Sequence, residues 1–206
     1  MLTIYGRDSS SNVQKVLWLC KELGLPYESA HAVAPGTAKD SDAFMKLNPN
    51  GLIPAIDEDG FVLWESNAIL RYLAAKHANG TLFAADLRVR ADADRWMDWQ
   101  ATALAPPMSI LLRQLVRTQA DKRDAELIAT TAAEIRAKVR ILDAALAGRA
   151  YLAGEAFTIA DIAVGQWMWR YVTLVPDRPA TPNLQAWYER LQRRKAFVET
   201  VMQPLV

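Results

Sequence analysis

Hydrophobic residues near the start of the chain switch between strand-like and helical spacing. A short apolar strand over residues 2–5 is followed by a polar turn, and a helix is then predicted by apolar residues at helical spacing, namely Val13, Val16, Leu17, Cys20 and Leu23. Gly24 and Pro26 end this helix, and residues 27–33 predict a second strand. Because a helix carries the chain back between them, the two strands should be parallel.

A β-hairpin that leads directly into a helix is predicted further along. Apolar runs at 55–56 and 61–64 flank an Asp59-Gly60 turn, and a helix begins near Ser66 with no loop between strand and helix. A short helical segment over 43–47 precedes the hairpin. The resulting order, β-α-β-α-β-β-α, predicts an α/β domain with a mixed sheet.

Two positions around this hairpin are candidates for ligand binding. The helix start at Ser66 exposes unpaired N–H groups and a partial positive charge, which favour an anionic group such as a carboxylate. The alternative is that Ser66 is a helix cap and nothing more. Pro54, at the entry to the first hairpin strand, indicates a bent backbone or a cis bond whose unpaired amide groups can face a peptide.

Only helical spacing is found after residue 88. One helix must kink or restart at Pro106-Pro107, and a long helical stripe ends at Gly148. Thr158 followed by Asp161 forms a capping box, so we expect the central helix of an all-α domain to begin there.

This change of pattern predicts the domain organisation. We expect an α/β domain over residues 1–78, a linker over 79–87 that contains Asn79-Gly80, and an all-helical bundle over 88–206.

Composition narrows the class of protein. The 206 residues are 51% hydrophobic and carry 24 basic and 23 acidic side chains, and no basic block points to nucleic acid or a membrane surface. Without a signal peptide or an apolar run of ~18 residues, we expect a cytoplasmic protein. Cys20, the single cysteine, falls on the apolar side of the first helix and is interpreted as a core residue, while His31 and His77 are too scattered for a metal site.

Four motifs in order resemble the cytosolic glutathione S-transferases across the whole chain. They are Ser10-Ser11-Asn12-Val13-Gln14-Lys15-Val16, Asn48-Pro49-Asn50-Gly51-Leu52-Ile53-Pro54, Glu65-Ser66-Asn67-Ala68-Ile69 and Phe157-Thr158-Ile159-Ala160-Asp161. Each motif alone is a weak indication of this family, but the four in this order and at these separations are a specific one. The resemblance implies a thioredoxin-like N-terminal domain, an all-helical C-terminal domain, glutathione as co-substrate and an isologous homodimer.

The same resemblance assigns the residues that hold glutathione. Glu65 and Ser66 would hold the α-amino and carboxylate groups of the γ-glutamyl end. Ile53, just before the cis-proline position Pro54, would pair its backbone with the cysteinyl part of the tripeptide.

A hydroxyl group would stabilise the thiolate of glutathione. By the family's serine-type motif this donor is Ser10, with Ser9 and Ser11 as neighbours that can compete and Asn12 as a further donor. Tyr5 is the rival, because some classes of the family use a tyrosine at the end of the first strand.

Two further subsites complete the expected site. Leu52 stands where many relatives carry a polar residue, so Lys39 or Asn50 would have to bind the glycine carboxylate. The helical domain would contribute a pocket for an apolar or aromatic electrophile, with candidates that are either core or pocket residues: Trp96, Trp99, Met108, Leu112, Arg113, Trp167 and Tyr171.

The resemblance therefore implies a detoxifying glutathione S-transferase that activates the thiol for attack on a small electrophile. One alternative keeps the site but performs glutathione-dependent disulfide reduction or peroxidase chemistry. The other is a non-catalytic dimeric interaction module with the same fold.

Overall fold

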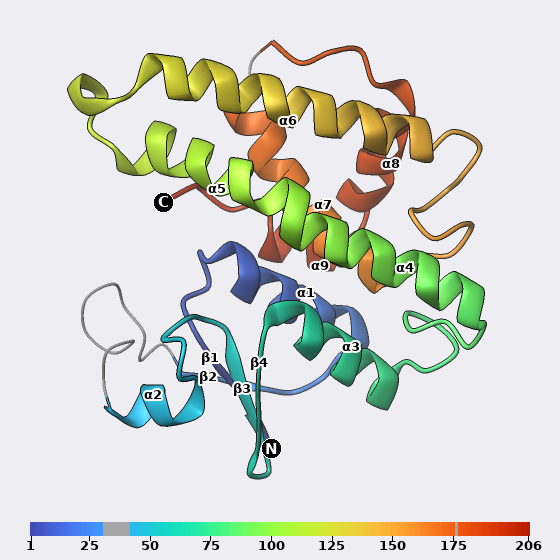
Figure 1. Ribbon diagram of the computed structural model, residues 1–206. Helices are drawn as coiled ribbons and strands as arrows, with labels where there is room; N and C mark the ends of the chain where they lie inside the picture. The colour runs from blue at the N-terminus through green and yellow to red at the C-terminus, as the bar shows by residue number, and fades with distance from the viewer. Residues whose placement is uncertain (31–41, 176) are drawn as a thin grey trace. The chain divides into compact units, whose positions relative to one another are not determined.

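The structure, a computed structural model, describes residues 1–30, 42–175 and 177–206, which form two compact units (Figure 1). The first unit spans Met1–Asn79 and the second spans Gly80–Val206.

The first unit is an α/β domain with a mixed four-stranded sheet, as predicted. The strand order is β2-β1-β3-β4, in which β1 pairs with β2 in parallel and with β3 antiparallel. Strands β3 and β4 form the predicted hairpin. The elements in chain order are β1 (Leu2–Tyr5), α1 (Ser11–Leu23), β2 (Glu28–Ala30), α2 (Asp42–Leu47), β3 (Ala55–Glu58), β4 (Phe61–Trp64) and α3 (Ser66–His77).

Helices α1 and α3 pack against each other along the sheet (Figure 1). Four residues of the predicted stripe of α1 are buried, namely Val13, Val16, Leu17 and Cys20, while Leu23 is half-buried. Gly24 ends the helix in the left-handed conformation at φ 62°. Strand β2 begins at Glu28, one residue later than the predicted 27–33, and residues 31–33 of that prediction lie outside the described residues.

The second unit is all-helical among its described residues. Helix α7 is buried along most of its length and packs against α4, α5 and α8, which makes it the central helix that the capping box predicted. Its α-helices are α4 (Leu87–Trp99), α5 (Ala105–Leu112), α6 (Ala125–Ala145), α7 (Ile159–Leu174), α8 (Pro182–Gln192) and α9 (Lys195–Thr200).

The proline pair neither breaks nor restarts the helical path. A π-helical turn, Gln100–Leu104, joins α4 to α5, and the prolines fall in the first turn of α5 (Figure 1). A wider turn tolerates the missing proline N–H groups and gives the rings room beside the preceding carbonyls. A second π-helical turn, Arg113–Arg117, follows α5.

Asp161 ties the start of α7 to two other segments. It is fully buried, and its Oδ2 accepts from the Thr158 N–H at 2.8 Å, which confirms the capping box. Its Oδ1 accepts from the Leu152 N–H at 3.0 Å and from Trp187 Nε1, on α8, at 2.9 Å. Burial raises the pKa of Asp161 to about 6, against the opposing effect of these donors.

Candidate active site

Strand register brings three separated motifs to one end of the sheet in the first unit. Tyr5, the last residue of β1, pairs with Ala55, the first residue of β3, and Ala55 pairs with Trp64, the last residue of β4. The segments that follow Tyr5, precede Ala55 and follow Trp64 therefore emerge side by side. These segments carry the three motifs that the sequence predicted to bind one ligand.

Gly6 lets two of these segments approach closely. It has φ 153°, and a side chain here would meet the Val13 side chain at 2.5 Å and Ile53 Cβ at 3.3 Å. A residue with a Cβ would push the turn before α1 away from both neighbours.

Ser10 occupies the N-cap position of α1. Its carbonyl accepts the first helical bond, from the Gln14 N–H at 2.9 Å, and its N–H donates to the Arg7 carbonyl at 3.0 Å. Its side chain makes no capping hydrogen bond to the helix. The hydroxyl therefore stands at the positive end of a helix without the partner that an N-cap serine usually has.

The competing hydroxyls are placed differently. Ser11 is already the first residue of α1, and Ser9 lies one position before the cap. Tyr5 is half-buried and packs against a small core that contains Phe44 and Ala55. These positions favour a packing role for Tyr5.

One buried side chain makes hydrogen bonds to the backbone of the loop before β3. Asn48 is 2% exposed, its amide donates to the Leu52 carbonyl at 2.6 Å, and its Oδ1 accepts from the Asn50 N–H at 3.0 Å. The Ile53-Pro54 peptide bond is cis. The backbone N–H and carbonyl of Ile53 have no hydrogen-bond partner among the described residues, so they are available to an added strand.

Glu65 joins β4 to α3 in an unusual backbone conformation. It occupies the N-cap position with φ 71° and ψ 109°, a region that non-glycine residues rarely adopt, and its side chain is exposed. Ser66 is therefore the first helical residue and not the cap that was the alternative. The result is an exposed carboxylate beside the first-turn N–H groups of α3, which suits a ligand that carries both an amine and a carboxylate.

Lys15 has a role in the structure that its sequence context did not indicate. Its side chain is 1% exposed, and Nζ donates to Ser66 Oγ at 3.3 Å and to Asn67 Oδ1 at 3.2 Å. Ser66 Oγ in turn donates to Asn12 Oδ1 at 3.3 Å. The network links the N-terminal turns of α1 and α3, which hold the two halves of the expected site.

The electrostatics of Lys15 are unusual for a lysine. Burial lowers its pKa from 10.5 to about 7, because the ammonium ion is removed from water, and the charge of Glu65 opposes this shift. A buried ammonium ion next to Ser66 adds positive charge where an anion would bind.

The candidates for the glycine carboxylate remain predictions. Lys39 lies outside the described residues. Asn50 is exposed, but its side-chain amide already donates to Asn48 Oδ1 at 3.0 Å.

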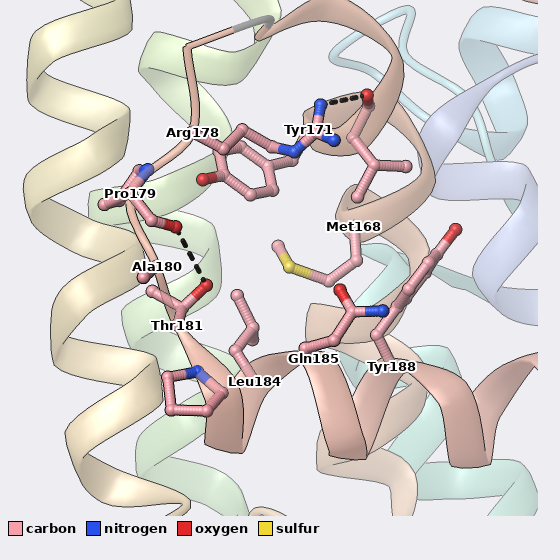
Figure 2. Close-up of a pocket in the computed structure, with 11 residues that line it drawn as sticks. Met168, Tyr171, Arg178, Pro179, Ala180, Thr181, Leu184, Gln185 and Tyr188 are labelled. Carbon is pink, nitrogen blue, oxygen red and sulfur yellow. Dashed lines mark hydrogen bonds between the residues drawn. The ribbon is translucent and has the colours of Figure 1, made fainter.

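The expected electrophile residues all lie in the second unit, and most are buried there. Trp99 is half-buried and Arg113 is exposed, while Tyr171 lines a cavity within the second unit. Figure 2 shows this cavity, to which none of the other six contributes. The buried members are Trp96, Met108, Leu112, Trp167 and Tyr171.

Other chemical groups are less suited to catalysis. Cys20 is fully buried on α1, and burial raises the pKa of its thiol to about 12, so it is a core residue and a poor nucleophile. The described residues contain no cluster of side chains that could hold a metal ion. None of the described helices is long and apolar enough to cross a membrane.

Comparison with known families identifies the class. Residues 9–76 match the model of the glutathione S-transferase N-terminal domain, and residues 102–195 match that of the C-terminal domain. The chain belongs to the glutathione S-transferase family, and its activity is that of a transferase.

Individual relatives cover the full chain. Glutathione S-transferase GstB of Escherichia coli (strain K12) is 39% identical, with 100% of each chain covered. Glutathione S-transferase 3 of Zea mays is 34% identical, covering 97% of this chain and 93% of its own. The solved theta class glutathione S-transferase of Xanthomonas axonopodis pv. citri, with glutathione bound, has a TM-score of 0.94 and 40% identity, covering 100% of this chain and 99% of its own.

Proposed function

We propose that this glutathione S-transferase uses Ser10 to stabilise the thiolate of bound glutathione. A free thiol with a pKa near ~8.5 is mostly protonated at neutral pH. The Ser10 hydroxyl donates to the sulfur, the N-terminus of α1 adds partial positive charge, and the thiol proton passes to solvent. The thiolate then attacks an electrophilic carbon, so that a C–S bond forms while the leaving group departs with its electron pair.

The tripeptide would be held at three points along the same sheet end. Glu65 pairs with the α-amino group, while Ser66 and the N-terminus of α3 bind the γ-glutamyl carboxylate. The free backbone groups of Ile53, fixed by Pro54, pair with the cysteinyl residue as an added strand does. Asn12 contributes by its bond to Ser66.

The observation that carries this proposal is the register of β1, β3 and β4. It brings Ser10, Ile53 and Glu65-Ser66 to one end of the sheet, although they lie far apart in sequence. The glutathione-bound state of the Xanthomonas relative supports glutathione as the ligand at this end of the sheet.

The proposal extends to the electrophile, the glycine carboxylate and the assembly of the protein. The electrophile is apolar or aromatic and is met by side chains of the second unit, for which Trp99 and Arg113 are the accessible candidates. The glycine carboxylate is bound by Lys39 or Asn50. The protein is a cytoplasmic homodimer that needs no metal.

Calorimetry and turnover test the proposal. Glutathione should bind to the wild-type protein, and turnover of a model aryl halide should fall about 100-fold or more in Ser10→Ala while binding changes little. Ser9→Ala and Ser11→Ala are matched controls that keep most activity. Absence of glutathione binding, or an unchanged rate in the triple Ser9, Ser10 and Ser11 variant, would show the mechanism to be wrong.

Relative rates decide between the transferase and its reductase alternative. A mixed disulfide of glutathione should be turned over much more slowly than the aryl halide. The opposite ranking would select disulfide reduction at the same site.

A further inference from the structure

Lys15 is a buried titratable group that activation of the thiol by Ser10 does not require. It lies on α1 with 1% of its side chain exposed, and Nζ donates to Ser66 Oγ at 3.3 Å and to Asn67 Oδ1 at 3.2 Å. Both acceptors belong to the first turn of α3, which packs against α1 (Figure 1). The amine therefore lies directly behind the helix start at which the γ-glutamyl carboxylate of glutathione is proposed to bind.

Both protonation states of Lys15 fit this pair of acceptors. A neutral amine has two N–H groups, which suffice for Ser66 and Asn67, and the ammonium form has a third. Burial favours the neutral form and lowers the pKa of Lys15 to about 7. Near neutral pH, a change in the charge around this group therefore changes its protonation.

The charged groups near Lys15 lie at the start of α3, further along α3 and on α1. Glu65, at the N-cap of α3, favours the ammonium form, but its effect is smaller than that of burial. Arg71, in the second turn of α3, is itself positive. The acidic residue of α1 is Glu22, two turns beyond Lys15, and it accepts a hydrogen bond from Trp18 Nε1 at 2.8 Å. The other ionisable groups of α3 contact Glu58 further along the helix: Tyr72, Lys76 and His77.

Glutathione would bring a further negative charge to the start of α3. A carboxylate oxygen that is hydrogen-bonded to Ser66 lies at most about 6 Å from Lys15 Nζ, because Nζ is 3.3 Å from Ser66 Oγ and an O–H···O⁻ bond measures about 2.7 Å. An opposite charge within ~4–6 Å raises the pKa of an amine by roughly 1–3. In the complex, Lys15 should therefore stay largely protonated up to about pH 8 or above.

We propose that Lys15 takes up a proton when glutathione binds, and that the ammonium ion then holds Ser66 and the first turn of α3 in place for the γ-glutamyl carboxylate. This role rests on the proposed binding of glutathione at the start of α3. The proton comes from solvent and is accepted by the lone pair of the amine, so no bond of the tripeptide changes. Lys15 is a positioning residue, because it is buried and acts through Ser66.

Isothermal titration calorimetry of S-methylglutathione into the full-length protein measures this proton uptake. The methyl group removes the thiol, whose own ionisation would release a proton. The change of the binding enthalpy with the ionisation enthalpy of the buffer then gives the number of protons that each chain takes up.

The expected uptake by the wild-type protein depends on pH. At pH 8 only about a tenth of the free chains carry this proton, so binding should take up about 0.4–0.9 proton per chain. At pH 5.5 the amine is already protonated, and the uptake should be almost zero. The Kd for S-methylglutathione should accordingly rise about five- to tenfold from pH 6 to pH 8.

Three variants make the test specific. Lys15→Met carries no charge and Lys15→Arg stays charged at every pH used, so in both the proton uptake should vanish and Kd should hardly change between pH 6 and pH 8. At pH 8, Lys15→Arg should bind at least as tightly as the wild type, whereas Lys15→Met should bind about tenfold more weakly than the wild type at pH 6. Lys21→Met, at an exposed position of the same helix, should behave as the wild type does.

The possible failures of this test are distinguishable. Equal proton uptake in the wild type and Lys15→Met at pH 8, or no uptake by the wild type at either pH, would overturn the role of Lys15 and leave glutathione as the ligand. Absence of S-methylglutathione binding to the wild-type protein would instead refute the glutathione site itself, and the role of Lys15 with it.

Discussion

The buried ammonium group of Lys15 should destabilise the folded protein in a pH-dependent way that one substitution removes. Its pKa falls from 10.5 in the unfolded chain to about 7 in the folded one, mainly through burial. Since one unit corresponds to about 1.4 kcal/mol, charging the buried group costs the fold on the order of 5 kcal/mol. The charge of Glu65 opposes the shift and so already reduces this cost.

The sign of the pH dependence follows from proton binding. Between about pH 7 and 10.5 the unfolded chain holds a proton on Lys15 that the folded chain has released, so the free energy of unfolding rises with pH. The penalty is absent above pH 10.5 and complete below about pH 7. From pH 7 to 9, Lys15 should add about 2–3 kcal/mol.

Lys15→Met isolates this contribution because it keeps most of the length of the side chain and removes the charge. Urea unfolding at equal chain concentration should give a variant that is several kcal/mol more stable than the wild type at pH 6, with the difference shrinking towards pH 9. Lys21→Met, on an exposed position of the same helix, should behave like the wild type. Equal pH slopes in the wild type and Lys15→Met, or a variant that is less stable at pH 6, would refute the reasoning.

Three other predictions concern the site and its support. Lys15→Met should weaken glutathione binding about tenfold at pH 6.5, measured by calorimetry, because the carboxylate loses a nearby cation. Glu65→Gly should be about 1 kcal/mol more stable to urea than Glu65→Ala, since glycine accepts φ 71° without strain, while both lose affinity for glutathione. Asp161→Asn should lower stability by about 2–3 kcal/mol in thermal or urea unfolding, because an amide group would face the Thr158, Leu152 or Trp187 donors.

Each of these three predictions has an outcome that would contradict it. Unchanged binding in Lys15→Met would leave that residue with a packing role. Equal stability of the two Glu65 variants would show that the backbone there is unstrained, and a stable Asp161→Asn would show that the network around α7 can rearrange.

Local sequence signals predicted the fold well because most elements depend on neighbouring residues. The Asp59-Gly60 turn specified the hairpin, and Thr158 with Asp161 specified the start of α7. Pro106-Pro107 was ambiguous, because a π-helical turn before the prolines keeps the helix continuous, and no residue type encodes that turn uniquely.

The site was predictable where a motif carries its own chemistry and not where a role depends on distant contacts. Ser66 at a helix start follows from local spacing. Lys15 acquires its role only from partners more than fifty residues away. The pattern of hydrophobic and polar residues around it therefore does not predict that it is buried. The positive φ of Glu65 likewise results from the passage of β4 into α3, and nothing in a glutamate signals it.

The most direct test of the Ser10 mechanism is the pKa of the glutathione thiol on the enzyme, followed by the ultraviolet absorbance of the thiolate across a pH series. In the wild-type protein it should fall at least about one unit below the free value of ~8.5, and in Ser10→Ala it should return close to that value. The Ser9→Ala and Ser11→Ala proteins should keep the lowered pKa. An equally low thiol pKa in Ser10→Ala would contradict the assignment of Ser10 as the hydroxyl that stabilises the thiolate.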